Sequence, residues 1–149
     1  MHIEKFTHEN TDYFNACMSI RTVVFVDEQK VDQAIEKDGR DTECIHYILF
    51  DRGIAIGTAR RRFTENGLKL ERLAILKEYR GKGFAHVLMQ FILKDILPSK
   101  QKIYMHAQRG VEDIYKKYGF KIVGEMFTEA GIGHYLMEHE NNGELTMKN

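Results

Sequence analysis

Residues 73–85 read Leu73-Ala74-Ile75-Leu76-Lys77-Glu78-Tyr79-Arg80-Gly81-Lys82-Gly83-Phe84-Ala85. Here an apolar segment typical of a strand passes through a loop of glycines and basic residues directly into a predicted helix. Glycines let a phosphate approach the backbone, and the first turn of a helix offers unpaired N–H groups with partial positive charge. Arg80 and Lys82 add full charges. The stretch predicts an anion-binding loop, although a tight turn with solvated basic side chains would use the same residues.

The spacing in this loop argues against two common nucleotide-binding motifs. The loop matches neither G-x-x-x-x-G-K-[ST], which cradles nucleotide phosphates, nor G-x-G-x-x-G, which binds dinucleotides. Nucleotide hydrolysis and dinucleotide binding therefore lose support.

The segments before the loop predict one strand, one or two helices and then a sheet. Residues 1–7 fit an edge strand, and the polar residues 32–43 fit a second helix and a loop. Asn10 or Thr11 can cap a first helix, whose buried face holds Tyr13, Phe14, Cys17 and Ile20. Asn66-Gly67 suits a hairpin turn. We therefore expect an antiparallel meander of three strands, at residues 45–50, 54–63 and 68–76.

The segments after the loop predict two helices and three strands. Apolar residues recur at nearly helical spacing over residues 84–97, and Pro98 closes that helix. A short helix with an apolar face at 111, 114, 115 and 118 ends at Gly119. The strands are expected at residues 102–107, 121–127 and 134–139.

Size and composition indicate one domain. The chain has 149 residues, of which 43% are hydrophobic and 30% charged, and it contains one proline. This is typical of a single globular unit. We expect one domain over residues 1–140 and a polar C-terminal tail over residues 141–149.

The charge balance and the cysteines limit the partners and the compartment. Lys plus Arg and Asp plus Glu both number 22, so no global field draws the protein to nucleic acid or to an anionic membrane. Cys17 and Cys44 suggest neither a disulfide framework nor a zinc site, and a reducing cytoplasm fits best. The seven histidines show no metal-ligand cluster. No apolar run approaches the roughly 20 residues of a membrane span, and the N-terminus lacks a signal-peptide stretch.

Two motifs together resemble the GNAT superfamily of acyltransferases. Arg80, Gly83 and Ala85 fill its fingerprint [Q/R]-x-x-G-x-[G/A], and residues 114–120, Ile-Tyr-Lys-Lys-Tyr-Gly-Phe, are similar to its second motif F-Y-x-x-x-G-F. Residues 24–29 resemble a bacterial subgroup of small members, mostly of unassigned substrate. The resemblance covers nearly the whole chain. It implies a three-layer α/β fold with a mixed, mostly antiparallel sheet flanked by helices.

The resemblance also implies the cofactor, acetyl-CoA, and its position. Its pyrophosphate would lie on the backbone of Arg80, Gly81, Lys82, Gly83, Phe84 and Ala85. Its pantetheine arm would lie beside the strand at Leu73, Ala74 and Ile75, where a bulge in the family separates this strand from the next. An Asn often follows the second strand in the family, and Gln108 stands near that position here.

The activity implied is transfer of an acetyl group to a primary amine by direct attack in a ternary complex, so no Ser or Cys nucleophile is needed. The amine would belong to a small molecule or a peptide. An acyl-CoA-binding regulatory domain without turnover, and a transferase of longer acyl groups or one acting on hydroxyls, remain alternatives. Dimerisation is common in the family. The acceptor pocket would come from residues 20–43 and 127–135.

Individual roles follow from position and chemistry. Glu71 would share a face with Leu73 by the strand period and serve as general base, unless it only pairs with Arg72 or Arg60. Glu28 is the competing base or amine anchor. By resemblance, Tyr115 would protonate or hydrogen-bond the departing thiolate, although its apolar helix face also fits a core residue. His134 is a candidate substrate contact. The run Arg60-Arg61-Arg62 is expected to be an alternating strand segment with at least one solvated face, although one of these arginines could contact an acidic acceptor.

Overall fold

The computed structural model describes residues 1–140, so the expected tail at 141–149 lies outside the described residues. One sheet of eight strands has the order β1-β2-β3-β4-β5-β8-β6, and β7 pairs with β8. The strands are β1 (His2–Phe6), β2 (Ile45–Asp51), β3 (Ile54–Thr64), β4 (Gly67–Ile75), β5 (Ile103–Gln108), β6 (Phe120–Ile122), β7 (Phe127–Glu129) and β8 (Ile132–His139). The helices are α1 (Thr11–Arg21), α2 (Gln33–Glu36), α3 (Phe84–Ile96) and α4 (Glu112–Lys116), and a π-helical segment, Thr22–Glu28, continues α1.

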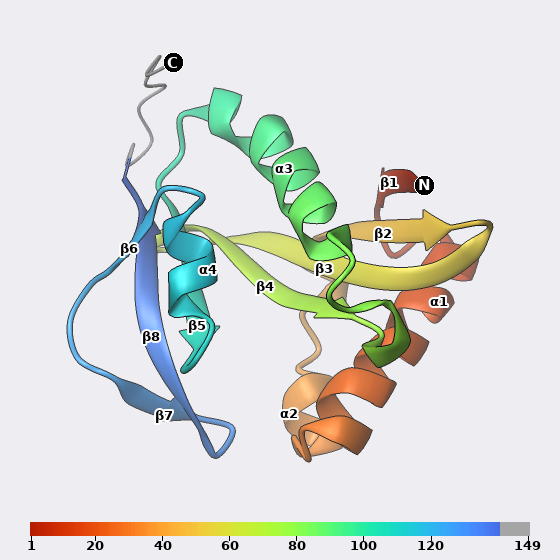
Figure 1. The fold of residues 1–149 in the computed structure, drawn as a ribbon, viewed down its shortest axis with the longest axis horizontal. Coiled ribbons are helices and arrows are strands. Elements are labelled where there is room, and N and C mark those ends of the chain that lie inside the picture. The colour runs from red at the N-terminus through yellow and green to blue at the C-terminus, as the bar shows by residue number, and fades with distance from the viewer. Residues whose placement is uncertain (141–149) are drawn as a thin grey trace.

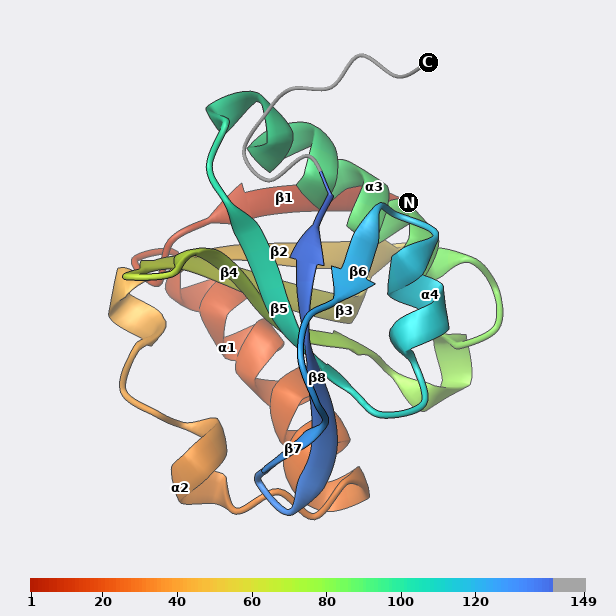
Figure 2. The same ribbon diagram turned by 90° about the vertical axis from the view of Figure 1, so that its left-hand side faces the viewer.

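The sheet lies between two layers of helices. The helices α3 and α4 lie on one face, and α1 and α2 lie on the other (Figures 1 and 2). Of the strand pairs, β4 with β5 is parallel and the others are antiparallel. The expected three-layer fold with a mixed, mostly antiparallel sheet is confirmed. No helix within residues 1–140 is long and apolar enough to cross a membrane.

The two long helices form where the pattern predicted them. The Asn10 side chain caps α1 and accepts a hydrogen bond from the Tyr13 N–H at 3.2 Å. On α3, the side chains that face the core recur at helical spacing: Leu88, Met89, Ile92, Leu93 and Ile96. Pro98 lies in the short 3₁₀ turn that follows α3. These buried faces hold both helices against the sheet.

Two connections between strands add detail to the expected pattern. Thr64 pairs with Gly67, so the expected hairpin turn forms over residues 64–67, with Glu65 and Asn66 at its centre. Gly67 also allows a close approach, because its φ is 127° and a Cβ there would lie 2.5 Å from the carbonyl oxygen of Lys102. The strand expected at 121–127 divides into β6 and β7, and Gly124, with φ of 82°, lies between them.

A bulge in β4 sets up the site. Arg60 pairs with Glu71, whereas Thr58 pairs with Ala74, so two residues of β4, Arg72 and Leu73, stand opposite one residue of β3. Arg72 has a φ of 56°. The parallel pairing of β4 with β5 ends at Leu70, and beyond this point the strands diverge (Figure 1). The expected separation of the two strands is therefore present.

The bulge also reverses which side chains face α3. Before it, Leu68 and Leu70 pack in the core cluster that includes the α3 side chains, and after it Leu73 and Ile75 pack there. Glu71 and Leu73 consequently point to opposite faces. The expectation that they share a face is wrong, because the additional residue interrupts the period of two.

The three arginines of β3 are not a solvated segment. Arg60 is only 1% exposed, and Arg61 and Arg62 have side chains that are 16% and 13% exposed. Arg60 forms ion pairs with Asp38, Asp41 and Glu71. These pairs join β3 and β4 to the segment around α2, so Arg60 is a structural residue.

Candidate active site

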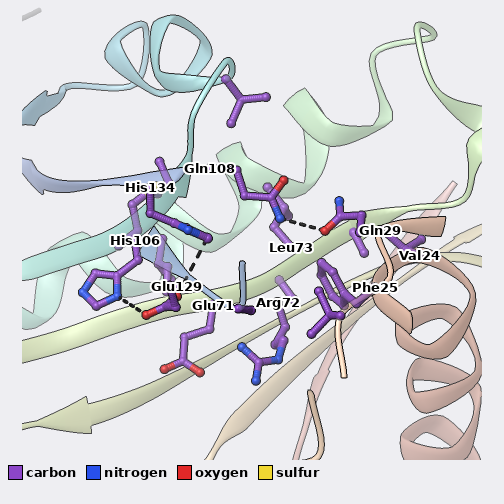
Figure 3. Close-up of a pocket in the computed structure, with 18 of the residues that line it drawn as sticks. Val24, Phe25, Gln29, Glu71, Arg72, Leu73, His106, Gln108, Glu129 and His134 are labelled. Atoms are coloured by element: carbon purple, nitrogen blue, oxygen red, sulfur yellow. Dashed lines mark hydrogen bonds and ion pairs between the residues drawn. The ribbon is translucent and has the colours of Figure 1, made fainter. Parts of the chain in front are cut away.

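A cavity of about 490 Å³ lies where β4 and β5 separate. Its walls come from the π-helical segment and α2 on one side, β4 and β5 in the middle, and α4 and the β7–β8 hairpin on the other side (Figure 3). Residues from both expected acceptor segments, 20–43 and 127–135, line it. The volume suits a small-molecule site.

The loop before α3 presents free main-chain N–H groups. Within the described residues, no acceptor bonds the N–H groups of residues 81–86, and the first helical bond of α3 runs from Val87 N to Gly83 O at 3.2 Å. Gly81 and Gly83 have φ of 75° and 87°, and a Cβ on either would meet nothing within 4 Å. The Arg80 N–H is occupied, because it donates to the Lys77 carbonyl. This exposed row of donors at a helix N-terminus fits a phosphate group.

The Arg80 side chain stands beside this loop and is already engaged. Its Nε donates to the Ile75 carbonyl at 2.8 Å, and its two terminal nitrogens donate to the Glu28 carboxylate at 2.6 and 2.9 Å. These hydrogen bonds hold the pKa of Glu28 below its usual value. Glu28 is thus placed next to the loop of residues 80–85, called the anion loop below, and does not line the cavity. Lys82 lies over the Tyr79 ring, 5.8 Å from its centroid.

The strand residues expected beside the pantetheine arm do line the cavity. Leu73, Ala74 and Ile75 lie along the part of β4 that has separated from β5. Across the gap, Gln108 at the end of β5 donates from Nε2 to Oε1 of Gln29 at 2.8 Å (Figure 3). The free edge of β4 offers main-chain groups that an extended chain can pair with.

Glu71 lines the cavity but is held by cations. Its carboxylate, 4% exposed, accepts from Nε of Arg60 at 2.9 Å and Nε of Arg62 at 2.7 Å, and Lys69 lies 3.4 Å away. Burial alone would raise the pKa of Glu71, but the surrounding cations outweigh it and lower the pKa. A carboxylate with a lowered pKa and occupied oxygens is a poor proton acceptor, which argues against Glu71 as the general base.

Tyr115 lines the cavity from α4. Its ring packs edge-on against Phe120 with centroids 6.4 Å apart, and within residues 1–140 its hydroxyl has no hydrogen-bond partner. Burial raises the pKa of Tyr115 to about 12. The phenol is therefore protonated at neutral pH, and its O–H is free to donate a hydrogen bond.

A cluster of two histidines and a glutamate lines the cavity at β5 and the β7–β8 hairpin, and of these three residues the sequence singles out only His134. Nδ1 of His106 lies 3.0 Å from Oε1 of Glu129, and Nε2 of His134 lies 3.8 Å from Oε2 of the same carboxylate (Figure 3). The hydrogen bond with His106 lowers the pKa of Glu129. No local motif marks Glu129 or His106, because the β5–β8 and β7–β8 pairings bring them together.

The cysteines are unsuited to nucleophilic chemistry. Cys17 and Cys44 are buried and unbridged, and burial raises the pKa of each thiol to about 11. In the part of the chain that the structure describes, no group of three His, Cys, Asp or Glu side chains is arranged to hold a metal ion.

Comparison with known proteins gives concordant matches. Residues 11–141 match the model of an acetyltransferase (GNAT) domain. The uncharacterized protein YyaT of Bacillus subtilis (strain 168) is 34% identical over 151 residues, which cover 98% of this chain and 100% of YyaT. The crystal structure of an acyl-CoA N-acyltransferase from Pseudomonas aeruginosa superposes with a TM-score of 0.84 at 27% identity and covers 93% of this chain and 98% of that one.

A more distant match was solved with a ligand. The crystal structure of an aminoglycoside 6'-N-acetyltransferase complexed with coenzyme A has a TM-score of 0.73 at 14% identity, covering 93% of this chain and 96% of that one. At this identity the match speaks for the fold alone.

Proposed function

The chain belongs to the GNAT acetyltransferase family and is an acyl-CoA-dependent N-acyltransferase, and from this premise we propose that it moves an acetyl group from acetyl-CoA to a primary amine. In this proposal the amine attacks directly within a ternary complex, and it belongs to a small molecule or a peptide. The observation that carries the proposal is the free edge of β4 beside a helix N-terminus with unbonded N–H groups.

The residues of the anion loop fit a pyrophosphate. Residues 81–86 supply unbonded N–H groups, and Gly81 and Gly83 leave the approach to the backbone open. The guanidinium of Arg80 adds charge once Glu28 releases it. Leu73, Ala74 and Ile75 would hold the pantetheine arm along the free strand edge.

Acetyl-CoA supplies the acyl group as a thioester, whose carbonyl carbon is open to attack by an amine. Tyr115 would donate a hydrogen bond to the departing sulfur. Because its pKa is raised to about 12, full transfer of its proton to a thiolate of pKa near 8.5 is uphill by about 5 kcal/mol. Stabilisation by the hydrogen bond is therefore the larger part of its role.

The amine must lose its proton before or during attack. At pH 7 this costs about 4.6 kcal/mol for a lysine-like amine of pKa near 10.4, and about 1.4 kcal/mol for an α-amine of pKa near 8. A proton acceptor on the acceptor side of the cavity matters more for the first kind of amine.

Two measurements test the proposal. Calorimetry should detect binding of coenzyme A, and release of free thiol from acetyl-CoA should depend on an added primary amine. We would screen spermidine, kanamycin, glycine and a peptide with a free N-terminus. Binding of coenzyme A without thiol release at high enzyme concentration would reject amine acetylation, and competition by longer acyl-CoA esters would reveal a different acyl preference. An absence of heat with coenzyme A would reject the cofactor site itself.

A further inference from the structure

His134 has one ring nitrogen engaged and the other facing a carboxylate. Its Nδ1 lies 2.7 Å from the carbonyl oxygen of Ile132. A carbonyl only accepts, so Nδ1 carries a hydrogen and donates it. In the neutral ring, Nε2 then has a free lone pair. The residue is only 6% exposed, and its ring stacks on Phe127 with centroids 5.9 Å apart, so its orientation is fixed.

The carboxylate opposite this nitrogen also has a free acceptor. Oε1 of Glu129 takes the hydrogen bond from His106, whereas Oε2 has no hydrogen-bond partner among the described residues. Oε2 and Nε2 of His134 are 3.8 Å apart, which is too long for a direct hydrogen bond. When the His134 ring is neutral, two unsatisfied acceptors thus lie side by side at the wall of the cavity (Figure 3).

A primary amine is the chemical group that satisfies both acceptors. It carries two hydrogens when neutral and three when protonated, whereas a hydroxyl or thiol carries one. We propose that His134 and Glu129 together bind the amine of the acceptor, with Nε2 of His134 as the proton acceptor and Oε2 of Glu129 as the second hydrogen-bond acceptor. This inference rests on the proposed acetyl transfer and names the residues of its acceptor side.

The proton and electron changes balance without a further reactant. The amine nitrogen forms a bond to the acyl carbon, the carbon–sulfur bond breaks, and its electron pair stays on sulfur. One proton of the amine passes to Nε2 of His134, and Glu129 stabilises the imidazolium that results. The sulfur receives a hydrogen bond from Tyr115 and finally takes up, through water, the proton held by His134, which returns the imidazole to its neutral form and completes the free thiol.

His106 serves as a positioning residue in this arrangement. Its bond to Oε1 fixes the Glu129 carboxylate, and its ring packs edge-on against Phe127 with centroids 5.0 Å apart. The charged and titratable groups near His134 are Glu129 on β7, His106 on β5, Lys69 on β4 and Arg109, whose main-chain N–H donates to the Gly133 carbonyl at 2.7 Å.

The test compares the wild type with His134→Gln and Glu129→Gln, which keep size and remove the basic nitrogen or the charge. On the best amine of the panel, we expect kcat/KM to fall about 100-fold in His134→Gln and about 10-fold in Glu129→Gln, with unchanged affinity for coenzyme A. The deficit of His134→Gln should narrow as the pH rises, because more amine is already neutral. His2→Gln and Glu125→Gln, at exposed positions, are the matched controls.

A second readout does not depend on turnover. In NMR spectra of the wild type, spermidine should shift the imidazole signals of His134, and the shift should be lost in Glu129→Gln. Wild-type rates in both variants, a deficit of His134→Gln that is the same at every pH, or unmoved His134 signals would overturn the inference. If the signals move but no amine is acetylated, the amine site stands and the proposed transfer fails.

Discussion

Tyr115 is a half-buried phenol whose hydroxyl lines the cavity and has no hydrogen-bond partner within residues 1–140. Its ring also packs against the main core. The ring of Tyr115 thus has a packing role, whereas the chemical role proposed for this residue depends on its hydroxyl alone.

Tyr115→Phe removes the hydroxyl and keeps the ring. If the hydroxyl stabilises the departing sulfur, kcat should fall about 10- to 100-fold, which corresponds to the loss of one hydrogen bond to a charged group. The melting temperature and the affinity for coenzyme A should stay close to wild type, because the packing against Phe120 remains. Steady-state thiol release and calorimetry measure these quantities. Unchanged turnover would leave Tyr115 with a core role only.

The sequence predicted single residues well where the motif is local. Gly81 and Gly83 leave the backbone of the loop open to approach, as the glycine-rich stretch predicted. Prediction from the sequence failed for residues whose position depends on a partner far away in the chain. Glu28 and Arg80 are 52 residues apart, and their ion pair places Glu28 beside the anion loop rather than in the acceptor pocket. Glu129 and His106 carry no signal of their own and meet only through strand pairing.

At the scale of elements, the loop between β4 and α3 combines open glycines with the helix N-terminus. A methyl group at Gly81 or Gly83 would touch no protein atom within 4 Å. It would, however, stand on the surface that the pyrophosphate approaches in the proposed cofactor position. An alanine at any position with a positive φ loses stability for the same conformational reason. A glycine outside the loop can therefore serve to separate this loss of stability from a loss of affinity for coenzyme A.

We predict that Gly81→Ala and Gly83→Ala lose affinity for coenzyme A about 10-fold or more and lose about 1 to 2 kcal/mol of stability from the positive φ. Gly124→Ala is the matched control, because Gly124 has a φ of 82°, an equally open surrounding and a place outside the loop. It should lose similar stability and keep its affinity. Calorimetry with coenzyme A and urea unfolding make the comparison. Equal affinities in all three variants would contradict the placement of the pyrophosphate.

The strand pattern could not predict at which residues of β4 the bulge lies. Nothing in Glu71-Arg72-Leu73 marks it, since Arg72 adopts a φ of 56° without being a glycine. Its side chain explains the conformation: Nε of Arg72 donates to Oε2 of Glu36 on α2 at 2.9 Å. A contact between distant segments therefore sets the local backbone and, through it, which face each later residue of β4 occupies.

At the scale of the whole molecule, a buried ion-pair network joins the helical layer of α1 and α2 to the sheet. Arg21 and Arg60, each 1% exposed, share the carboxylate of Asp41. Arg60 also pairs with Asp38 and Glu71. Because both guanidinium groups are buried, the loss of one carboxylate partner would leave a buried charge incompletely paired, which is costly. The network forms the wall of the cavity that Glu71 lines, so the same contacts support the fold and shape the site.

This network makes stability depend on pH in a definite direction. The pKa values of Asp38, Asp41 and Glu71 are all lowered in the folded state: burial alone would raise them, but the neighbouring guanidinium groups outweigh it. A lowered folded-state pKa contributes stability above the unfolded value, 3.8 for Asp and 4.5 for Glu, and that contribution is lost as the pH falls through the folded-state pKa. The free energy of unfolding should therefore be nearly level above about pH 5 and decline below it.

Glu71→Gln isolates one member of the network. At pH 7 it removes a buried carboxylate from beside Arg60, and we expect a loss of about 3 to 5 kcal/mol in the free energy of unfolding. As the pH falls below about 4.5, Glu71 is protonated in the unfolded wild type before it is protonated in the folded protein, so the gap between the two proteins should shrink. Urea unfolding at pH 7, 5, 4 and 3 measures both curves, with Glu125→Gln as an exposed control that should follow the wild type. Parallel curves for Glu71→Gln and wild type would mean that the charge of Glu71 does not stabilise the fold, and the link between this wall of the cavity and the sheet would then have to rest on packing alone.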